Sequence, residues 1–155
     1  MKAIIACEKS GGIGKDGAMP WPKDEKDLAR FKELTLNSTV IMGRGTWEGK
    51  GMPKPLPHRQ NIVVSTSQLT LPEDVLQIDN LTSLDILDDL KVDWCIGGAG
   101  LFHSLLPQID EIHLTRIRGE YDCDTKIDLQ RIKDEFTCVH DLMCITHDYE
   151  IWKRQ

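Results

Sequence analysis

Apolar, strand-like runs alternate with helical patterns through the first two-thirds of this chain, and this alternation constrains its fold most. Strands separated by helices favour an α/β domain with a largely parallel sheet, because a helix is the usual crossover between parallel strands. From Glu111 onward the strand patterns have no clear helix between them, which predicts an antiparallel edge. The strand-like runs are 2–7, 39–43, 61–65, 75–78, 92–96, 110–117, 136–143 and 149–154, and the helical patterns are 25–35, 45–50, 82–88 and 99–106.

Length and charge limit the classes of function. A chain of 155 residues is expected to form a single domain, residues 1–155. The net charge of −6 argues against a general affinity for nucleic acid or an anionic membrane, although a few local arginines can still bind a small anion. The acidic surface, with no obvious apolar patch motif, favours a monomer.

The first residues and the cysteines predict a cytoplasmic protein. The apolar run in 1–8 is too short for a signal peptide core or a membrane span. The five cysteines are odd in number and form no C-x-x-C pair, which favours a reducing compartment.

Glycine and proline gather in three segments, 11–17, 49–55 and 97–100, each of which follows or joins a strand. Ligands of open α/β sheets bind beyond the carboxyl ends of the strands. These three segments are therefore candidates for the rim of one cleft.

The acid Asp27 has two possible roles. Asp27 and Phe31 lie four residues apart, and Leu28, Phe31 and Leu34 share one helical face, so Asp27 borders an apolar stripe. A partly dehydrated carboxylate there needs a partner, which a ligand could provide. Alternatively, Asp24 is the N-cap and Asp27 bonds back to it from the third helical position. Spacing alone leaves both open.

The segment 94–102 runs from a strand through glycines into a helix, as a pyrophosphate cradle or a plain tight turn would. The dinucleotide fingerprint would need glycine at His103, so it fails, and no Walker sequence is present. Arg44 opens a second helix after a strand and could pair with a phosphate or be a solvated surface arginine.

Metal-assisted and nucleophilic mechanisms have no support in the sequence. The histidines show no metal-ligand spacing, and no G-x-S-x-G elbow is present. Each histidine is expected to be a surface or strand-packing residue.

Seven short motifs span essentially the whole chain in a defined order. They are Ala18–Trp21, Asp27–Lys32, Val40–Glu48, Pro55–Asn61, Ile96–Gly98, Leu114–Ile117 and Asp124–Thr125. Each motif alone is weak, but seven in register are very specific, and together they resemble the dihydrofolate reductase family. The resemblance implies a central, mostly parallel eight-stranded sheet with an antiparallel C-terminal edge, flanked by about four helices. It also implies NADPH-dependent reduction of 7,8-dihydrofolate to tetrahydrofolate, and inhibition by antifolates such as methotrexate.

For the substrate, the resemblance implies that Asp27 hydrogen-bonds the pterin's amidine edge, with Thr115 as its partner and Trp21 helping to hold a water. Asp27 would act at a distance, through water or pterin tautomers, and mainly by its charge. Met19 completes the catalytic group, in a mobile loop from Gly11 that closes over the nicotinamide. The remaining implied substrate contacts are Ile5, Ala6, Cys7, Leu28 and Phe31 around the pterin, Lys50 at the aminobenzoyl ring, Lys32 and Arg59 at the glutamyl tail, and Ile96.

For the cofactor, the resemblance implies that Arg44, Ser65 and Thr66 surround the 2′-phosphate of NADPH. It also implies a non-proline cis bond between Gly97 and Gly98. The remaining implied cofactor contacts are Cys7, Ile13, Gly14, Gly17, Ala18, Gly45, Thr46, Gly97, Gly98, Ala99, Gly100, Leu101 and Phe102.

The chain departs from the family's pattern at several positions. The loop before Ile13 is one residue shorter than in familiar bacterial members, and an extra residue precedes Asp27. Gly45 replaces a side chain that is often basic or polar, Phe102 stands where many bacterial members have Tyr, and Lys50 replaces an apolar residue.

Two other functions were weighed against dihydrofolate reduction. One is a reductase of the same fold that acts on another heterocycle, such as a ribosylated aminopyrimidine; the other is a silent nucleotide-binding module. Arg59 argues against the first, because it has a role only if the substrate carries a glutamyl tail. Intact Asp27 and Thr115 argue against the first as well. Degraded site positions would support the second, and none of the central positions is degraded.

Overall fold

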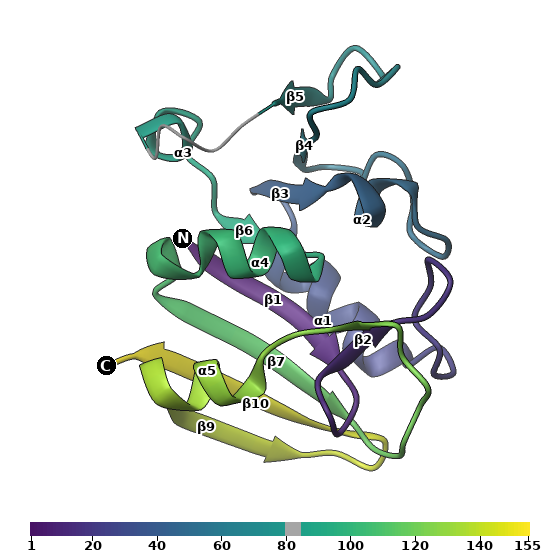
Figure 1. Cartoon of the computed structure of the whole chain (residues 1–155), viewed down its shortest axis with the longest axis vertical. Coiled ribbons are helices and arrows are strands. Elements are labelled where there is room, and N and C mark those ends of the chain that lie inside the picture. Colours follow the sequence, from purple (N-terminus) through teal and green to yellow (C-terminus); the bar gives the residue numbers. More distant parts are fainter. Residues whose placement is uncertain (80–84) are drawn as a thin grey trace.

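The computed structural model describes residues 1–79 and 85–155, and in it a twisted eight-stranded sheet forms the centre of the molecule (Figure 1). The strand order is β5-β4-β3-β6-β1-β7-β10-β9. Pairs from β5 to β7 are parallel, whereas β10 runs antiparallel to both β7 and β9. The mostly parallel sheet with an antiparallel C-terminal edge is confirmed. The strands are β1 (Lys2–Cys7), β3 (Thr39–Gly43), β4 (Gln60–Val64), β5 (Leu76–Ile78), β6 (Trp94–Cys95), β7 (Glu111–Ile117), β9 (Phe136–Met143) and β10 (His147–Arg154).

Five α-helices and one 3₁₀ turn accompany this sheet in the described residues. They are α1 (Glu25–Thr35), α2 (Arg44–Glu48), α3 (Asp85–Asp89), α4 (Ala99–Leu105), η1 (Leu106–Gln108) and α5 (Leu129–Glu135). The predicted bounds of α1 match those observed. The helix predicted over 82–88 begins outside the described residues, and its remainder lies in α3.

The prediction that no helix follows Glu111 was wrong, because α5 lies between β7 and β9. Only seven residues long, α5 is too short for a clear helical period. Its start signal was present: Asp128 is the N-cap, and its carboxylate accepts the backbone N–H of Arg131 at 3.1 Å.

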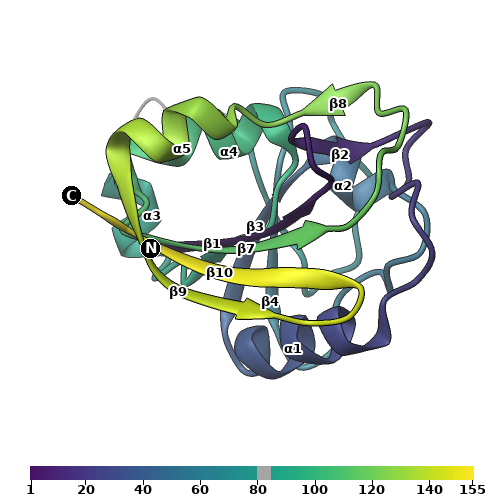
Figure 2. The same cartoon turned by 90° about the horizontal axis from the view of Figure 1, so that it is seen from below.

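A second, two-stranded sheet was also missed. It pairs β2 (Gly12–Gly14) with β8 (Thr125–Lys126) in antiparallel fashion. Figure 2 shows both strands on the same side of the main sheet as α4 and α5, with α1 on the opposite side. Strands of two and three residues are too short to produce a readable alternation.

Both faces of the parallel part of the main sheet are buried, which explains why its central strands are apolar runs. The edge strand β9, in contrast, is exposed at seven of its eight residues. Successive side chains of a strand point to opposite faces. Accordingly Ala3 and Ile5 belong to one core cluster, with Phe102 of α4 and Ile132 of α5. Ile4 belongs to a second cluster, against which Phe31 and Leu34 of α1 pack. None of the helices in the described ranges is long and apolar enough to cross a bilayer.

Candidate active site

The carboxyl ends of β3, β6 and β1 lie side by side, and the glycine-rich segments begin there. The backbone N–H of Gly43, at the end of β3, donates to the carbonyl of Gly97, which follows β6, at 2.8 Å. The loop at Gly17 also belongs to this edge, because its carbonyl accepts the N–H of Lys50 at 3.1 Å. All three predicted rim segments therefore lie at one edge of the sheet.

Asp27 lies in the first turn of α1 and faces the end of the neighbouring strand β7. The Thr115 hydroxyl donates to Asp27 Oδ1 at 2.6 Å, joining residues 88 positions apart. Asp24 is indeed the N-cap, and it accepts the backbone N–H of Asp27 at 3.1 Å. Each of the two acids therefore has one of the roles that the sequence left open. Asp24 caps the helix, and the Asp27 carboxylate accepts a hydrogen bond from the sheet.

Burial shapes the chemistry of Asp27. Its side chain is only 16% exposed, and this loss of hydration raises the pKa of the carboxyl above its ordinary value. The Thr115 hydrogen bond and the charge of Arg30 oppose that rise without cancelling it. Asp27 therefore takes up a proton more readily than an acid in water.

Apolar residues lie on α1 beside Asp27 and on the strands that end at the same edge of the sheet. Ile5 and Cys7 on β1 are buried, and Leu28 and Phe31 on α1 are half-buried. Burial raises the pKa of the Cys7 thiol to about 12, so this residue is an apolar wall and not a nucleophile. Ala6 and Ile96 are half-buried on neighbouring segments of the same rim.

The loop before α1 is anchored at Trp21. This indole is buried and meets the Tyr121 ring edge-on, with centroids 6.0 Å apart. Met19, two residues earlier, is 48% exposed. The loop thus has a fixed end at Trp21 and an exposed side chain that a ligand could cover.

Arg59 is held in place before any ligand binds. Its Nη1 donates to the Thr35 hydroxyl at 3.0 Å and its Nε to the Pro57 carbonyl at 2.9 Å. The guanidinium also lies over the Phe31 ring, 6.0 Å from its centroid. Lys32 and Lys50 are exposed, so this end of the site is cationic.

The predicted cofactor edge contains backbone that only glycine tolerates well. The peptide bond between Gly97 and Gly98 is cis, as the resemblance implied, and Gly97 has a φ of 104°. A Cβ added to Gly45 or Gly100 would meet no atom within 4 Å. Packing within the protein therefore does not require glycine at these two positions, and the space beside them is open to a ligand.

The predicted phosphate-binding side chains lie at the ends of β3 and β4. Arg44 is half-exposed, and its Nε donates to Glu48 Oε1 at 2.8 Å. Ser65 is buried, and its hydroxyl contacts the Ser67 backbone at 3.2 Å, whereas Thr66 is exposed. A surface ion pair such as Arg44–Glu48 contributes only about 0–1 kcal/mol, so Arg44 can exchange its partner at small cost.

The other predicted cofactor-binding residues differ in their surroundings and in how far they are buried. Thr46, Ala99 and Leu101 are half-buried around the glycines, and Ala18 forms a bridge with Lys15 in the 11–19 loop. Gly14 pairs with Thr125, and Ile13 packs against the core. The Phe102 side chain is only 1% exposed within the core, so it offers a cofactor almost no surface.

Sequence reasoning missed two residues beside Asp27. Arg30 Nη1 lies 3.9 Å from Asp27 Oδ1. His147, which contacts Arg30, is completely buried. The signal for Arg30 was available, because residues three apart share a helix face. His147 was expected only to pack or to face solvent, and nothing in its local pattern indicated polar contacts with α1.

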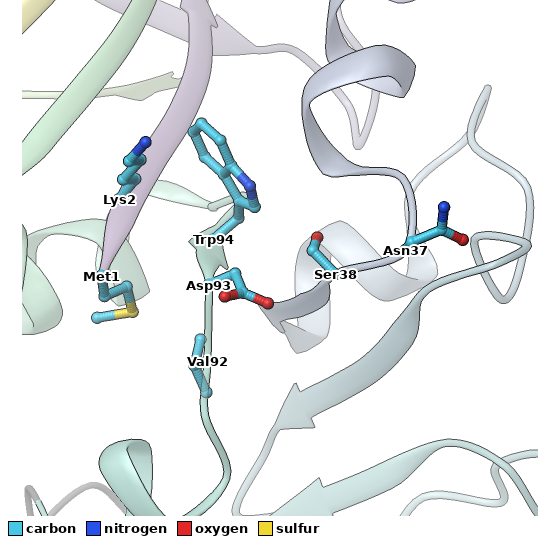
Figure 3. A pocket seen from close by; sticks show the side chains of 7 residues that line it. All are labelled: Met1, Lys2, Asn37, Ser38, Val92, Asp93 and Trp94. Carbon is cyan, nitrogen blue, oxygen red and sulfur yellow. The ribbon is translucent and has the colours of Figure 1, made fainter.

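A separate pocket of about 400 Å³ lies at the opposite end of the strands (Figure 3). It opens where β1 and β6 begin, whereas Asp27 and the glycine segments lie where the strands end. Its lining residues are Met1, Lys2, Asn37, Ser38, Val92, Asp93 and Trp94. The pocket therefore does not belong to the candidate active site.

Comparisons with known proteins agree with this geometry. The family model described as dihydrofolate reductase matches residues 1–148. The chain is 38% identical over 144 residues to dihydrofolate reductase type 8 of Escherichia coli, covering 86% of this chain and 84% of that protein. It is 42% identical over 123 residues to dihydrofolate reductase of Haemophilus influenzae, covering 79% and 74%. Dihydrofolate reductase from Enterococcus faecalis, solved with NADP(H) and RAB-propyl, superposes with a TM-score of 0.85 at 32% identity, covering 99% and 95%.

The raised pKa of Asp27 predicts the effect of Asp27→Asn on stability. At neutral pH both the folded and the unfolded chain carry the charge, and the folded state bears the cost of burying it. The free energy of unfolding of the native protein therefore rises, through this group, as the pH falls below the folded pKa of Asp27. Asp27→Asn should increase that free energy at pH 7 by roughly 0.5–2 kcal/mol, as replacement of a strained functional group often does.

Urea unfolding at a series of pH values measures this effect. The gain from Asp27→Asn should shrink toward zero as the native carboxyl becomes protonated. Asp122→Asn, at a side chain that is 94% exposed, is the matched control and should change little at any pH. A gain that grows with acidity would contradict the prediction.

Proposed function

The chain belongs to the dihydrofolate reductase family, and we propose that it reduces 7,8-dihydrofolate to 5,6,7,8-tetrahydrofolate with NADPH. The observation that carries the proposal is the Asp27 carboxylate, largely shielded from water and hydrogen-bonded to Thr115 at the carboxyl edge of the sheet. A pterin presents adjacent ring N–H and amino donors, and a carboxylate in an apolar pocket is a suitable acceptor for that pair.

Asp27 has one oxygen available for the pterin. Thr115 and Arg30 both approach Oδ1, so Oδ2 can accept from the amidine edge. When bound, NADPH supplies the hydride that goes to pterin C6, while N5 gains a proton. Asp27 favours that proton transfer because its negative charge, in a site of low polarity, stabilises a protonated pterin. The proton itself would travel through water or a pterin tautomer.

Arg59 supports dihydrofolate as the substrate over another heterocycle. Its fork is fixed by Thr35 and Pro57 at the mouth of the pocket, where the α-carboxylate of the glutamyl tail would lie. A planar guanidinium binds a carboxylate with two hydrogen bonds. Lys32 would lie near the same tail, and the aliphatic stem of Lys50 would cover the aminobenzoyl ring.

The residues at the other edge fit NADPH. The open space beside Gly45 and Gly100 suits a pyrophosphate that approaches the backbone closely. Arg44, with Ser65 and Thr66, would bind the 2′-phosphate, which distinguishes NADPH from NADH. Met19 and Trp21, on the loop before α1, would help exclude water when that loop closes.

The same proposal includes a monomeric enzyme in the cytoplasm that binds antifolates such as methotrexate. Its five free cysteines suit a reducing compartment. Burial raises the pKa of the Cys95 thiol to about 12, as it does for Cys7, so these two thiols resist oxidation.

The direct test is an absorbance assay. Purified protein with NADPH and dihydrofolate should lose nicotinamide absorbance, and methotrexate should stop that loss. A folded sample that gives no turnover would refute the proposed function.

Asp27→Asn tests the role of the acid. The variant should bind NADPH normally but lose most of its turnover near neutral pH, by about 10²-fold or more, because a positioned acid–base group contributes on that scale. Turnover should recover partly at lower pH, where dihydrofolate is protonated in solution. A pH–rate profile like that of the native enzyme would argue against the assignment.

Arg44→Ala tests the 2′-phosphate assignment. NADPH affinity should fall by about 10-fold or more, since a charge-assisted contact contributes roughly 1.5–3 kcal/mol, while NADH affinity should barely change. Glu48→Gln is the matched control: it releases Arg44 from its ion pair and should leave NADPH binding equal or tighter. Equal weakening of both cofactors by Arg44→Ala would remove Arg44 from this role.

A further inference from the structure

A cation lies beside Asp27, and the proposed function does not use it. Arg30 Nη1 is 3.9 Å from Asp27 Oδ1, and the two side chains are only 18% and 16% exposed. Both project from α1 with a spacing of three residues, which places them on one face. A long arginine side chain has many rotamers, so groups outside α1 must keep it in this position.

Two residues of β10 hold the guanidinium of Arg30. Its central carbon lies 4.1 Å from the centroid of the Tyr149 ring, in cation–π geometry. Its Nη1 lies 3.2 Å from His147 Nε2. Arginine can only donate hydrogen bonds, so His147 Nε2 must be the acceptor and carries no proton.

Asp24 fixes the orientation of the His147 ring. His147 Nδ1 lies 2.8 Å from Asp24 Oδ2, and the imidazole is completely buried. Because Nε2 accepts from Arg30, the ring proton belongs on Nδ1, which donates to Asp24. A carboxylate that orients an imidazole in this way selects both its tautomer and its direction.

The aromatic surface under Arg30 is fixed as well. The Tyr149 hydroxyl lies 2.5 Å from His113 Nδ1, and His113 Nε2 lies 2.7 Å from Glu111 Oε2. His113 also meets the Trp94 ring edge-on. Arg30 is therefore held between a bonded imidazole and a bonded phenol, both on rigid strands.

We propose that Arg30 is a positioning residue for the reaction: His147 and Tyr149 hold its guanidinium against Asp27, where its charge opposes protonation of the buried acid. This inference rests on the proposed function, because Arg30 acts only through Asp27. The charged or titratable groups around Asp27 are Arg30 of α1, the N-cap Asp24, and His147 and Tyr149 of β10; Thr115 of β7 contributes a hydroxyl.

The consequence is that Asp27 is ionised when the substrate arrives. Burial alone would favour the protonated carboxyl, which has lost the charge needed to stabilise a protonated pterin. The Arg30 cation shifts that equilibrium back without occupying Asp27 Oδ2. At 3.9 Å the contact is longer than a hydrogen bond, so Arg30 supplies charge and does not compete with the substrate.

The test is the titration of Asp27 in a series of variants. Carbon-13 NMR of the Asp27 carboxyl in the ligand-free protein reports its protonation directly, and the pH profile of hydride transfer reports it during turnover. Arg30→Met and Arg30→Gln should raise the pKa of Asp27 by about one unit or more, the usual effect of a charge at this distance. Arg30→Lys should restore most of the native value.

His147→Phe tests the holding role, because it keeps a buried ring and removes the acceptor for Arg30. It should shift the Asp27 titration in the same direction as Arg30→Met, but by less, since Tyr149 still supports the guanidinium. Thr146→Val is the matched control: it removes the hydroxyl that donates to Asp24 and leaves the His147–Arg30 contact. This control should leave the titration unchanged.

An unshifted titration in Arg30→Met would overturn the proposal, and so would an equal shift in Thr146→Val. The Arg30 variants decide the matter even if His147→Phe does not fold. Absence of turnover in the native protein would instead refute the proposed function, and the carboxyl titration would still report on Arg30.

Discussion

The position of α1 depends on the carboxylate of Asp24, which links the start of this helix to the turn before β10. One oxygen caps α1 by accepting the N–H of Asp27, and the other accepts from Thr146 and His147, more than 120 residues away. Hydrogen bonds from Thr146, Asp27 and His147 outweigh the effect of burial, which opposes them, and so lower the pKa of Asp24. Asp24 therefore stays charged at neutral pH and keeps α1 attached to the turn before β10.

That attachment determines where Asp27 can act. A first-turn acid on an isolated helix would be solvated and of ordinary acidity. Here α1 crosses one face of the sheet, so Asp27 meets Thr115 at the end of β7 and loses most of its contact with water. The same packing places Phe31 against the core cluster on that face. The eleven residues of α1 and its N-cap therefore provide the cap, a core contact and the proposed reactive acid.

The sequence allowed most of the fold to be predicted, because the central parallel strands are buried on both faces and form unbroken apolar runs. The α1 bounds followed from a clear stripe and an N-cap. The elements that were not predicted are short. Each of α5, β2 and β8 spans too few residues to show the hydrophobic periodicity of a helix or a strand. The residues of the candidate site were also only partly predictable. The resemblance to the family implied that Asp27 and Thr115 are partners, whereas His147 could be assigned no contact, since its partners lie on an element far away in sequence.

Two opposing effects act on the pKa of the Asp27 carboxyl, and the balance between them determines how readily it is ionised. Burial removes water and raises the pKa of the carboxyl, which strengthens its electrostatic effect on a bound pterin but risks neutralising it. The Thr115 hydroxyl and the Arg30 guanidinium act in the other direction, from two different sides of the acid. Without them, burial would shift the acid further toward its protonated, uncharged form. An acid exposed to water would contribute charge that solvent screens. The fold brings α1, β7 and β10 together so that the carboxylate can be both dehydrated and ionised.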